Sequence, residues 1–281
     1  MTQASVEYGA DWSAALRRGT DPELRRWLDL AMAACDEADA VALEHFRRDL
    51  QIETKPDRTL VTQADTAIER RIRQRIADMF PEHGLVGEEY GVEAGDAPIR
   101  WYIDPIDGTH NFIRGVPLFG TLLAVERDGE LQVAVLSAPA LGERWWGHRG
   151  GGAWARTRAQ EPRRVRVSGV ASLGDAQILY GSGREIMDSG LAPGFEGLLR
   201  AVWRDRGFGD FWGYALVAEG AAEAMIEVGL KSWDAAAPTV LIEEAGGRVT
   251  DFTGRRDIEA GTIVASNGRL HATVRARLTE A

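Results

Sequence analysis

The chain has 281 residues, of which 44% are hydrophobic and 27% are charged, and its formal net charge is −10. The composition is that of a globular protein, and the length allows two subdomains. The negative charge argues against a nucleic acid partner, because a phosphate backbone requires a basic surface. No apolar run approaches the length of a membrane span, and the single cysteine, Cys35, excludes an intrachain disulfide. We therefore expect a cytoplasmic protein with no membrane partner.

The first half of the chain predicts two helices followed by a group of strands. Residues 1–20 show no periodicity, and we expect them to form a poorly ordered extension. One helix is expected to begin at Asp21-Pro22, and a second at Thr62 with a buried apolar stripe that ends at Met79. Strand patterns then occupy residues 101–103, 118–127, 131–139 and 144–154.

The second half alternates between strand and helix patterns. Strands are predicted at residues 177–180, 203–208 and 224–228, and helices at residues 195–200, 214–222 and 235–245. The polar, basic segment 157–164 marks a boundary between an α+β subdomain (21–156) and an α/β subdomain (157–281). The pattern alone therefore predicts an α/β or α+β fold.

The segment from Trp101 to Phe112 carries the strongest chemical signal. Asp104 and Asp107 follow a short apolar strand and precede Gly108-Thr109. Taken alone, Asp-Pro-x-Asp-Gly is more often a surface turn than a site. Two other acidic groups also follow apolar runs, Glu88-Glu89 and the Asp234 segment. Carboxylate oxygens are the ligands that Mg²⁺ prefers, and backbone N–H groups at a turn bind anions. We therefore predict metal ions facing a phosphate.

These motifs together resemble the inositol monophosphatase family. They are Gly87-Glu-Glu89, then Asp104-Pro-Ile-Asp-Gly-Thr-x-Asn-Phe112, then Trp233-Asp-x-Ala-Ala237 with Glu244-Ala-Gly-Gly247. The resemblance implies a layered α-β-α-β-α sandwich, a homodimer, and a lithium-sensitive phosphomonoesterase that uses two or three Mg²⁺ ions. Segments 111–117 and 209–220 resemble the branch that acts on histidinol phosphate.

The resemblance also implies roles for individual residues. Thr109 and Glu88 would orient the attacking water, Asp65 would support them, and Gly108 and Thr109 would bind the phosphate. The implied metal ligands are Glu88, Asp104, the carbonyl of Ile106, Asp107 and Asp234. Because metals can activate water directly, we expect in-line attack without a phosphoenzyme.

Specificity is expected to come from Asp210 and Glu227, at positions that match the leaving-group side of the family's substrates. Two carboxylates there suit the ammonium and imidazole of histidinol phosphate, whereas a neutral polyol needs other partners. Alternatives remain for each acid: a helix cap for Asp65 and Asp234, a solvated or supporting position for Glu89, and a turn or an ion pair with Arg206 for Asp210. Pro238 is expected in the first turn of its helix.

Three other functions stay open at this point. The first is an inositol-1-phosphate or broad sugar-phosphate monophosphatase. The second is a relative that hydrolyses fructose bisphosphate or 3′-phosphoadenosine nucleotides. The third is a catalytically silent binding protein, which the complete set of acidic residues argues against.

Overall fold

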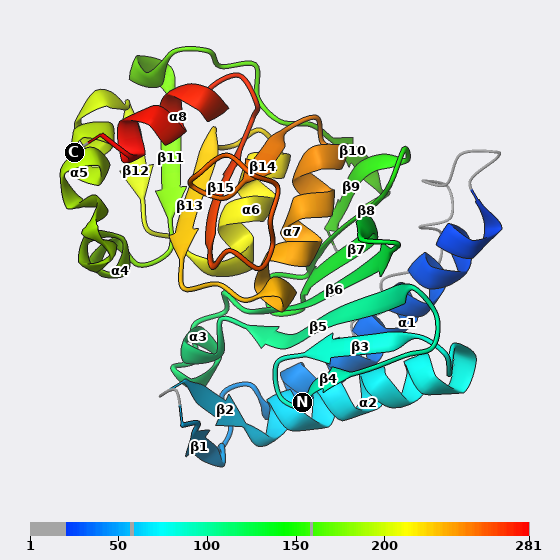
Figure 1. The fold of residues 1–281 in the computed structure, drawn as a ribbon. Helices are drawn as coiled ribbons and strands as arrows, with labels where there is room; N and C mark the ends of the chain where they lie inside the picture. Colours follow the sequence, from blue (N-terminus) through cyan, green and yellow to red (C-terminus); the bar gives the residue numbers. More distant parts are fainter. Residues whose placement is uncertain (1–20, 57–58, 158–159, 281) are drawn as a thin grey trace.

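Two β-sheets and three helical layers alternate through the part of the chain that the structure describes (Figure 1). This computed structural model describes residues 21–56, 59–157 and 160–280, so the expectation for residues 1–20 lies outside the described residues. Helices α1 and α2 cover one face of an eight-stranded sheet, and α6 and α7 separate its other face from a five-stranded sheet. Helices α5 and α8 cover the far face of the second sheet. The predicted α-β-α-β-α sandwich is confirmed.

The helices have the following bounds: α1 Pro22–His45, α2 Gln63–Met79, α3 Thr109–Ile113, α4 Gly183–Ile186, α5 Ala192–Ala201, α6 Asp210–Ala218, α7 Ser232–Glu244 and α8 His271–Leu278. A 3₁₀ turn, η2, covers Leu173–Asp175, and a π-helical turn, η3, covers Met187–Leu191. None of the helices in the described ranges is long and apolar enough to cross a membrane.

The eight-stranded sheet is antiparallel except for one pair, β3 and β5, which run parallel. Its strands, in spatial order, are β10 Arg163–Val165, β9 Gly152–Thr157, β8 Glu143–His148, β7 Glu130–Ala138, β6 Gly120–Arg127, β5 Ile99–Asp107, β3 Gly84–Gly87 and β4 Gly91–Glu93. A separate hairpin pairs β1 Ile52–Thr54 with β2 Leu60–Thr62. The sheet thus continues to Val165, past residue 157, and the division into two subdomains stays a prediction.

The five-stranded sheet is mixed. Its strands, in spatial order, are β12 Arg204–Arg206, β11 Gln177–Tyr180, β13 Ala224–Val228, β15 Thr262–Ser266 and β14 Arg248–Thr250. Strand β11 runs parallel to β12 and to β13, and the remaining pairs are antiparallel. The carboxyl ends of β11 and β13 therefore meet at one edge of the sheet, beside the cleft described below.

Both faces of the eight-stranded sheet are buried under helices. Neighbouring side chains along a strand point to opposite faces, so they pack against different helices. Leu123 and Val135 pack with residues of α1 and α2. Their neighbours Leu122 and Leu136 pack with residues of α6 and α7. This double burial explains why apolar residues follow one another without alternation in the middle of β6, at residues 122–125, and of β7, at residues 133–136.

Helices α1 and α2 begin where their capping residues predict. The Asp21 side chain accepts a hydrogen bond from the Glu23 N–H group, and Thr62 and Asp65 form a reciprocal capping box. The buried stripe of α2 is shorter than predicted, because Met79 is 46% exposed. The helix ends at Met79, and the buried ring of Phe80 fills the core at this point instead.

Two other predictions about helices were wrong. Helix α6 begins at Asp210, four residues before the predicted start at residue 214, because Gly209-Asp210 forms the helix start and not a separate turn. Pro238 lies in the interior of α7, because this helix already begins at Ser232. A proline there has no N–H group, so the carbonyl of Asp234 receives no hydrogen bond from it.

Candidate metal and phosphate site

The predicted site residues from both halves of the chain line one cleft of about 210 Å³. The acidic groups, the Gly108-Thr109 turn and the backbone after β13 surround it. The lining residues are Glu88, Asp104, Ile106, Asp107, Gly108, Thr109, Asp210, Glu227, Val228, Gly229, Leu230 and Asp234. Asp65 does not line the cleft and lies behind Thr109.

Strand β5 delivers Asp104 and Asp107 to the same side through a local irregularity. In a regular strand, residues three apart point to opposite faces. Here the pairing between β5 and β6 shifts, so that Asp104 lies opposite Leu122 and Asp107 opposite Gly120. The Thr121 hydroxyl donates a hydrogen bond of 2.8 Å to the carbonyl of Pro105 and stabilises the bulge. The extra residue re-aims both carboxylates into the cleft.

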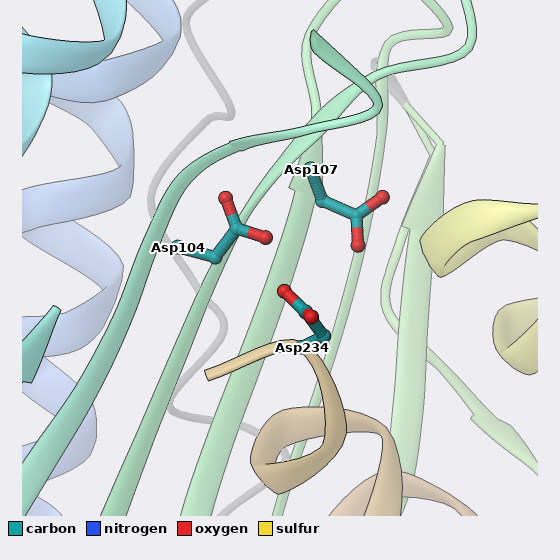
Figure 2. Close-up of side chains that lie close together, drawn as sticks. All are labelled: Asp104, Asp107 and Asp234. Atoms are coloured by element: carbon teal, nitrogen blue, oxygen red, sulfur yellow. The ribbon is translucent and has the colours of Figure 1, made fainter. Parts of the chain in front are cut away.

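Asp234 approaches the same point from the first turn of α7. Its Oδ2 atom accepts a hydrogen bond of 2.8 Å from the N–H group of Lys231, so Asp234 caps the helix and also joins the cluster. Figure 2 shows Asp104, Asp107 and Asp234 directed toward one another. Each offers one oxygen, and these oxygens all lie within 4.8 Å of one another. The two interpretations of Asp234, cap and cluster member, therefore hold together.

The electrostatics of this cluster are unfavourable without cations. Burial raises the pKa of Asp104 well above its usual range, and the charges of Glu88, Asp107 and Asp234 raise it further. Burial, followed by the charges of Asp210 and Asp234, raises the pKa of Asp107 in the same way. Burial also raises the pKa of Asp234 to about 6.

The donor set suits hard divalent cations. The Oδ1 atom of Asp104 is buried and has no hydrogen-bond partner within the described ranges. Buried polar atoms are normally satisfied, so an unpartnered oxygen on a carboxylate of this cluster fits a metal ligand. Oxygen-only ligands favour Mg²⁺, Ca²⁺ or Mn²⁺ over softer metals.

Glu88 follows strand β3 and is paired with Lys55. The Nζ atom of Lys55 lies 2.8 Å from Oε1 of Glu88 and 2.7 Å from Oε1 of Glu89. The Glu89 side chain is only 4% exposed, so this residue takes the supporting position and not the solvated one. Burial raises the pKa of Glu89 to about 7. Lys55 was not predicted as a site residue, because a lysine in a polar loop has no distinctive pattern.

Thr109 and Asp65 are connected beneath the cleft. The Oγ1 atom of Thr109 lies 3.3 Å from Oδ1 of Asp65 and 2.9 Å from the carbonyl oxygen of Ile106, so its one proton can be donated to either. The other oxygen of Asp65, Oδ2, accepts hydrogen bonds from the N–H and hydroxyl groups of Thr62. Asp65 is therefore both a helix cap and a partner of Thr109. Burial raises its pKa to about 6.

Gly108 is required by the backbone at the turn after β5. Its φ angle of 81° lies in the left-handed region, and an added Cβ would lie 2.9 Å from the carbonyl oxygen of Leu118. The same Cβ would lie 3.3 Å from the Asp210 carboxylate. A side chain here would therefore strain the turn and intrude on the cleft.

Asp210 and Glu227 border the cleft from the second sheet's side. Oδ2 of Asp210 accepts a hydrogen bond of 2.9 Å from Nδ2 of Asn111, and no ion pair with Arg206 forms among the described residues. Oε2 of Glu227 accepts a hydrogen bond of 2.5 Å from the Tyr214 hydroxyl. Burial raises the pKa of Asp210, and it raises the pKa of Glu227 to about 8.

Asn111 and Tyr214 were not predicted as site residues, although both lie in segments that carried the resemblance. The contact of Asn111 joins α3 to α6 across 99 residues, and the contact of Tyr214 joins α6 to the next strand, β13, across 13 residues. The only available signal was the position of Asn111 two residues after Thr109. A sequence pattern does not show which carboxylate such an amide will meet.

Fold and site together define a layered α/β protein with a carboxylate centre suited to divalent cations. The model of the inositol monophosphatase family matches residues 23–281, and the chain belongs to this family. The protein named histidinol-phosphatase of Streptomyces coelicolor is 45% identical, over 87% of this chain and 93% of that protein. The histidinol-phosphatase of Mycobacterium tuberculosis is 44% identical, over 89% and 97%. The crystal structure of extragenic suppressor protein suhB from Bartonella henselae matches with a TM-score of 0.84 at 28% identity, over 91% and 99%.

The acidic cluster predicts how the metal-free stability depends on pH. A carboxylate whose pKa is raised by folding destabilises the fold as the pH rises from its unfolded pKa through its folded pKa. Asp234 has a pKa of about 6, and the pKa values of Asp104 and Asp107 are also raised. In EDTA, Asp104→Asn should therefore be more stable than the wild type at pH 8 by about 1–3 kcal/mol, and this advantage should shrink toward pH 4.

Urea unfolding at pH 5 and pH 8 measures this difference. Asp96→Asn removes an exposed carboxylate outside the cleft and serves as the matched control, with little change expected at either pH. A loss of stability in Asp104→Asn that is equal at both pH values would contradict the electrostatic account.

Proposed function

We propose that this chain is a Mg²⁺-dependent phosphomonoesterase whose substrate is histidinol phosphate. The single observation that carries the proposal is the cleft itself, where the Asp104, Asp107 and Asp234 cluster lies beside two further acids, Asp210 and Glu227. The first group suits cations that bind a phosphate, and the second suits a cationic leaving group. The names of the relatives from Streptomyces and Mycobacterium support the same substrate.

The residues that would hold the metal ions are those expected from the resemblance. They are Glu88, Asp104, the Ile106 carbonyl, Asp107 and Asp234, all of which border the cleft. When bound, two or three Mg²⁺ ions would neutralise the phosphate dianion and acidify a water molecule. Glu88 would exchange its pairing with Lys55 for the metal, and Lys55 would keep its second partner, Glu89.

Thr109 is positioned to orient the attacking water together with Glu88. When the Thr109 hydroxyl donates to Oδ1 of Asp65, its oxygen is left with lone pairs directed away from that bond. Such an oxygen can accept a hydrogen bond from a water in the cleft. When the water gives its proton to the Thr109 oxygen, the proton of the hydroxyl group would pass to Asp65, whose pKa of about 6 lets it take up a proton near neutral pH. Because Ser, Cys and His side chains do not line the described cleft, we infer direct in-line attack by water without a phosphoenzyme.

The backbone after β5 would bind the phosphate. The N–H groups of Gly108 and Thr109 lie at the start of α3, where backbone donors lack partners within the helix. The missing side chain at Gly108 leaves the turn open to the cleft. These donors would orient the phosphate, while the cations would supply most of the charge compensation.

Asp210 and Glu227 would recognise the ammonium and imidazole groups of histidinol phosphate. The Tyr214 hydroxyl and the Asn111 amide each donate to one of these carboxylates and fix their orientation. Because Glu227 has a pKa of about 8, it is largely protonated in the free cleft at pH 7. A cationic group would favour its ionised form and gain a charge-assisted hydrogen bond, which a neutral polyol would not provide.

Three finer features also belong to this proposal. We infer a homodimer from the family resemblance and a cytoplasmic location from the single buried cysteine, Cys35. Subdomains 21–156 and 157–281 would then each contribute one side of the cleft. If the protein is instead an inositol-1-phosphate or sugar-phosphate monophosphatase, the metal ligands would be the same residues. Only the roles of Asp210 and Glu227 would be different.

Activity should depend on divalent cations and on Asp104. We expect chelation to abolish phosphate release from histidinol phosphate, Mg²⁺ to restore it, and lithium to inhibit it. Asp104→Asn should lose at least roughly a hundredfold in kcat, because metal catalysis is worth several kcal/mol. Phosphate release with and without EDTA measures this, and Asp96→Asn is the matched control. Full activity after exhaustive chelation would exclude the metal mechanism.

Substrate preference should depend on the two cleft acids. Glu227→Gln and Asp210→Asn should lower kcat/KM for histidinol phosphate far more than for a small uncharged phosphate ester. The unpaired partner left by such a change typically costs about 2–5 kcal/mol, and an uncharged ester never makes the pair. The quantity to compare is the ratio of kcat/KM for the two substrates.

Equal losses for both substrates would mean that these acids support the metals or the fold. No loss for either substrate would move the inositol or sugar-phosphate alternative ahead. A panel with inositol 1-phosphate, fructose bisphosphate and adenosine monophosphate would then identify the preferred leaving group.

A further inference from the structure

Glu69 is a fully buried carboxylate on α2 that has no part in the chemistry described above. Its side chain is 0% exposed, yet both of its oxygens are satisfied. Oε2 accepts a hydrogen bond of 2.7 Å from the N–H group of Glu89. Oε1 accepts bonds from the Tyr90 N–H group, at 3.2 Å, and from Nε of Arg73, at 2.8 Å. A buried carboxylate is costly unless paired in this way, so its presence here calls for a role.

Arg73 also binds the turn at residues 88–90 and the residue that follows it. It lies one helical turn after Glu69, and its Nη2 atom donates to the carbonyl oxygen of Gly91. Its guanidinium also lies 5.8 Å from the centre of the Tyr90 ring. The pair Glu69 and Arg73 therefore binds the backbone of residues 89, 90 and 91, directly after the expected metal ligand Glu88.

The residue before Glu88 is shaped for the same contact. A Cβ added to Gly87 would lie 2.0 Å from Oε1 of Glu69 and 2.9 Å from Nη2 of Arg73. Glycine at this position lets the Glu69 carboxylate lie against the backbone. Glu69 thus lies against the backbone on both sides of Glu88.

The spacing along α2 connects this turn to Thr109. Asp65, Glu69 and Arg73 are four residues apart, so they lie on one face of the helix. Asp65 contacts Thr109, and Glu69 contacts the turn that carries Glu88. The two groups expected to orient the attacking water are therefore held by one rigid element.

We propose that Glu69 is a positioning residue, whose buried carboxylate fixes Glu88 relative to Thr109 and so sets both metal affinity and the alignment of the water. This inference rests on the proposed function for the roles of Glu88 and Thr109. A carboxylate suits the task because it is acceptor-only and accepts from two N–H groups and an arginine at once. Glutamine keeps the shape but turns an NH₂ group toward one of these donors.

Glu69→Gln tests the proposal in the full-length protein, with Glu126→Gln as the matched control. Glu126 is also buried, at 7% exposed, and pairs with Arg100 and Tyr102, but it does not line the cleft. The first readout is Mn²⁺ binding to the substrate-free protein, which is measured from the electron paramagnetic resonance signal of the unbound ion. Mutations of residues behind metal ligands typically weaken metal binding about 10–100-fold, and we expect a loss in this range. The control should stay within about twofold of the wild type.

The second readout is the dependence of activity on Mg²⁺. In Glu69→Gln, the half-saturating Mg²⁺ concentration should rise at least about tenfold, and kcat should stay low at saturating Mg²⁺ because the water is misaligned. KM for the phosphate ester should stay within about threefold, because the phosphate and leaving-group contacts are elsewhere. Arg73→Lys keeps the positive charge but loses the planar guanidinium group with its several N–H donors. This variant should fold and should show a smaller rise in the half-saturating Mg²⁺ concentration.

The proposal would be overturned if Glu69→Gln bound Mn²⁺ within about twofold of the wild type with an unchanged kcat. It would also be overturned if Glu126→Gln, at a similar loss in Tm, weakened Mn²⁺ binding equally, since the effect would then be one of general stability. Because Mn²⁺ binding is measured without substrate, a wild type that binds Mn²⁺ but does not hydrolyse histidinol phosphate would contradict the proposed function and leave this comparison decisive.

Discussion

Asp104, Asp107 and Asp234 lie close enough together for their negative charges to oppose one another, with oxygens within 4.8 Å. In water such charges would separate, and in a partly buried cleft the repulsion is stronger because the local dielectric constant is lower. Burial first, and then the charges of neighbouring carboxylates, raise the pKa of each of these three carboxyl groups. The fold therefore spends packing and hydrogen-bond energy to hold an arrangement that becomes favourable only with cations.

Helix α7 is the main element that holds the acidic cluster together. It lies between the two sheets and contacts strands of both, as Figure 1 shows. Its first turns carry three successive alanines, 235–237, all buried. Small side chains allow the helix to approach the eight-stranded sheet closely, so that Asp234 reaches the carboxylates of β5. The parallel pair β3 and β5 brings Glu88 and Asp104 to the same edge, because carboxyl ends of parallel strands meet there.

Much of this could be predicted from local patterns, and the limits have physical reasons. The helices capped by Asp21 and Thr62 and the strand 224–228 were predicted correctly, because capping chemistry and apolar runs are local signals. The short strands β10, β14 and β15 were missed, since their pairing depends on distant segments. The start of α7 was placed too late, and so Pro238 was assigned to the wrong turn. The acidic groups were expected to converge because each follows an apolar run, and the structure brings them into one cleft.

The residues that support the metal ligands could not be predicted from the sequence. Nothing in the pattern of α2 distinguishes Glu69 from a solvated glutamate at helical spacing, and its burial follows only from the contact with the turn after β3. The same is true of Lys55, whose partners Glu88 and Glu89 are more than thirty residues away. Neither residue is expected to contact the substrate. Each is important because it positions residues that are expected to bind the metal ions or the attacking water.

The most direct test of the central claim, that the acidic cluster is a divalent cation site, is the anomalous diffraction from a crystal soaked in Mn²⁺ and inorganic phosphate. The account predicts anomalous peaks bounded by Asp104, Asp107 and Asp234, with the carboxylates of all three residues as ligands and the phosphate facing the Gly108-Thr109 turn. An empty cluster in a crystal that binds phosphate elsewhere, from an enzyme active under the same conditions, would contradict it.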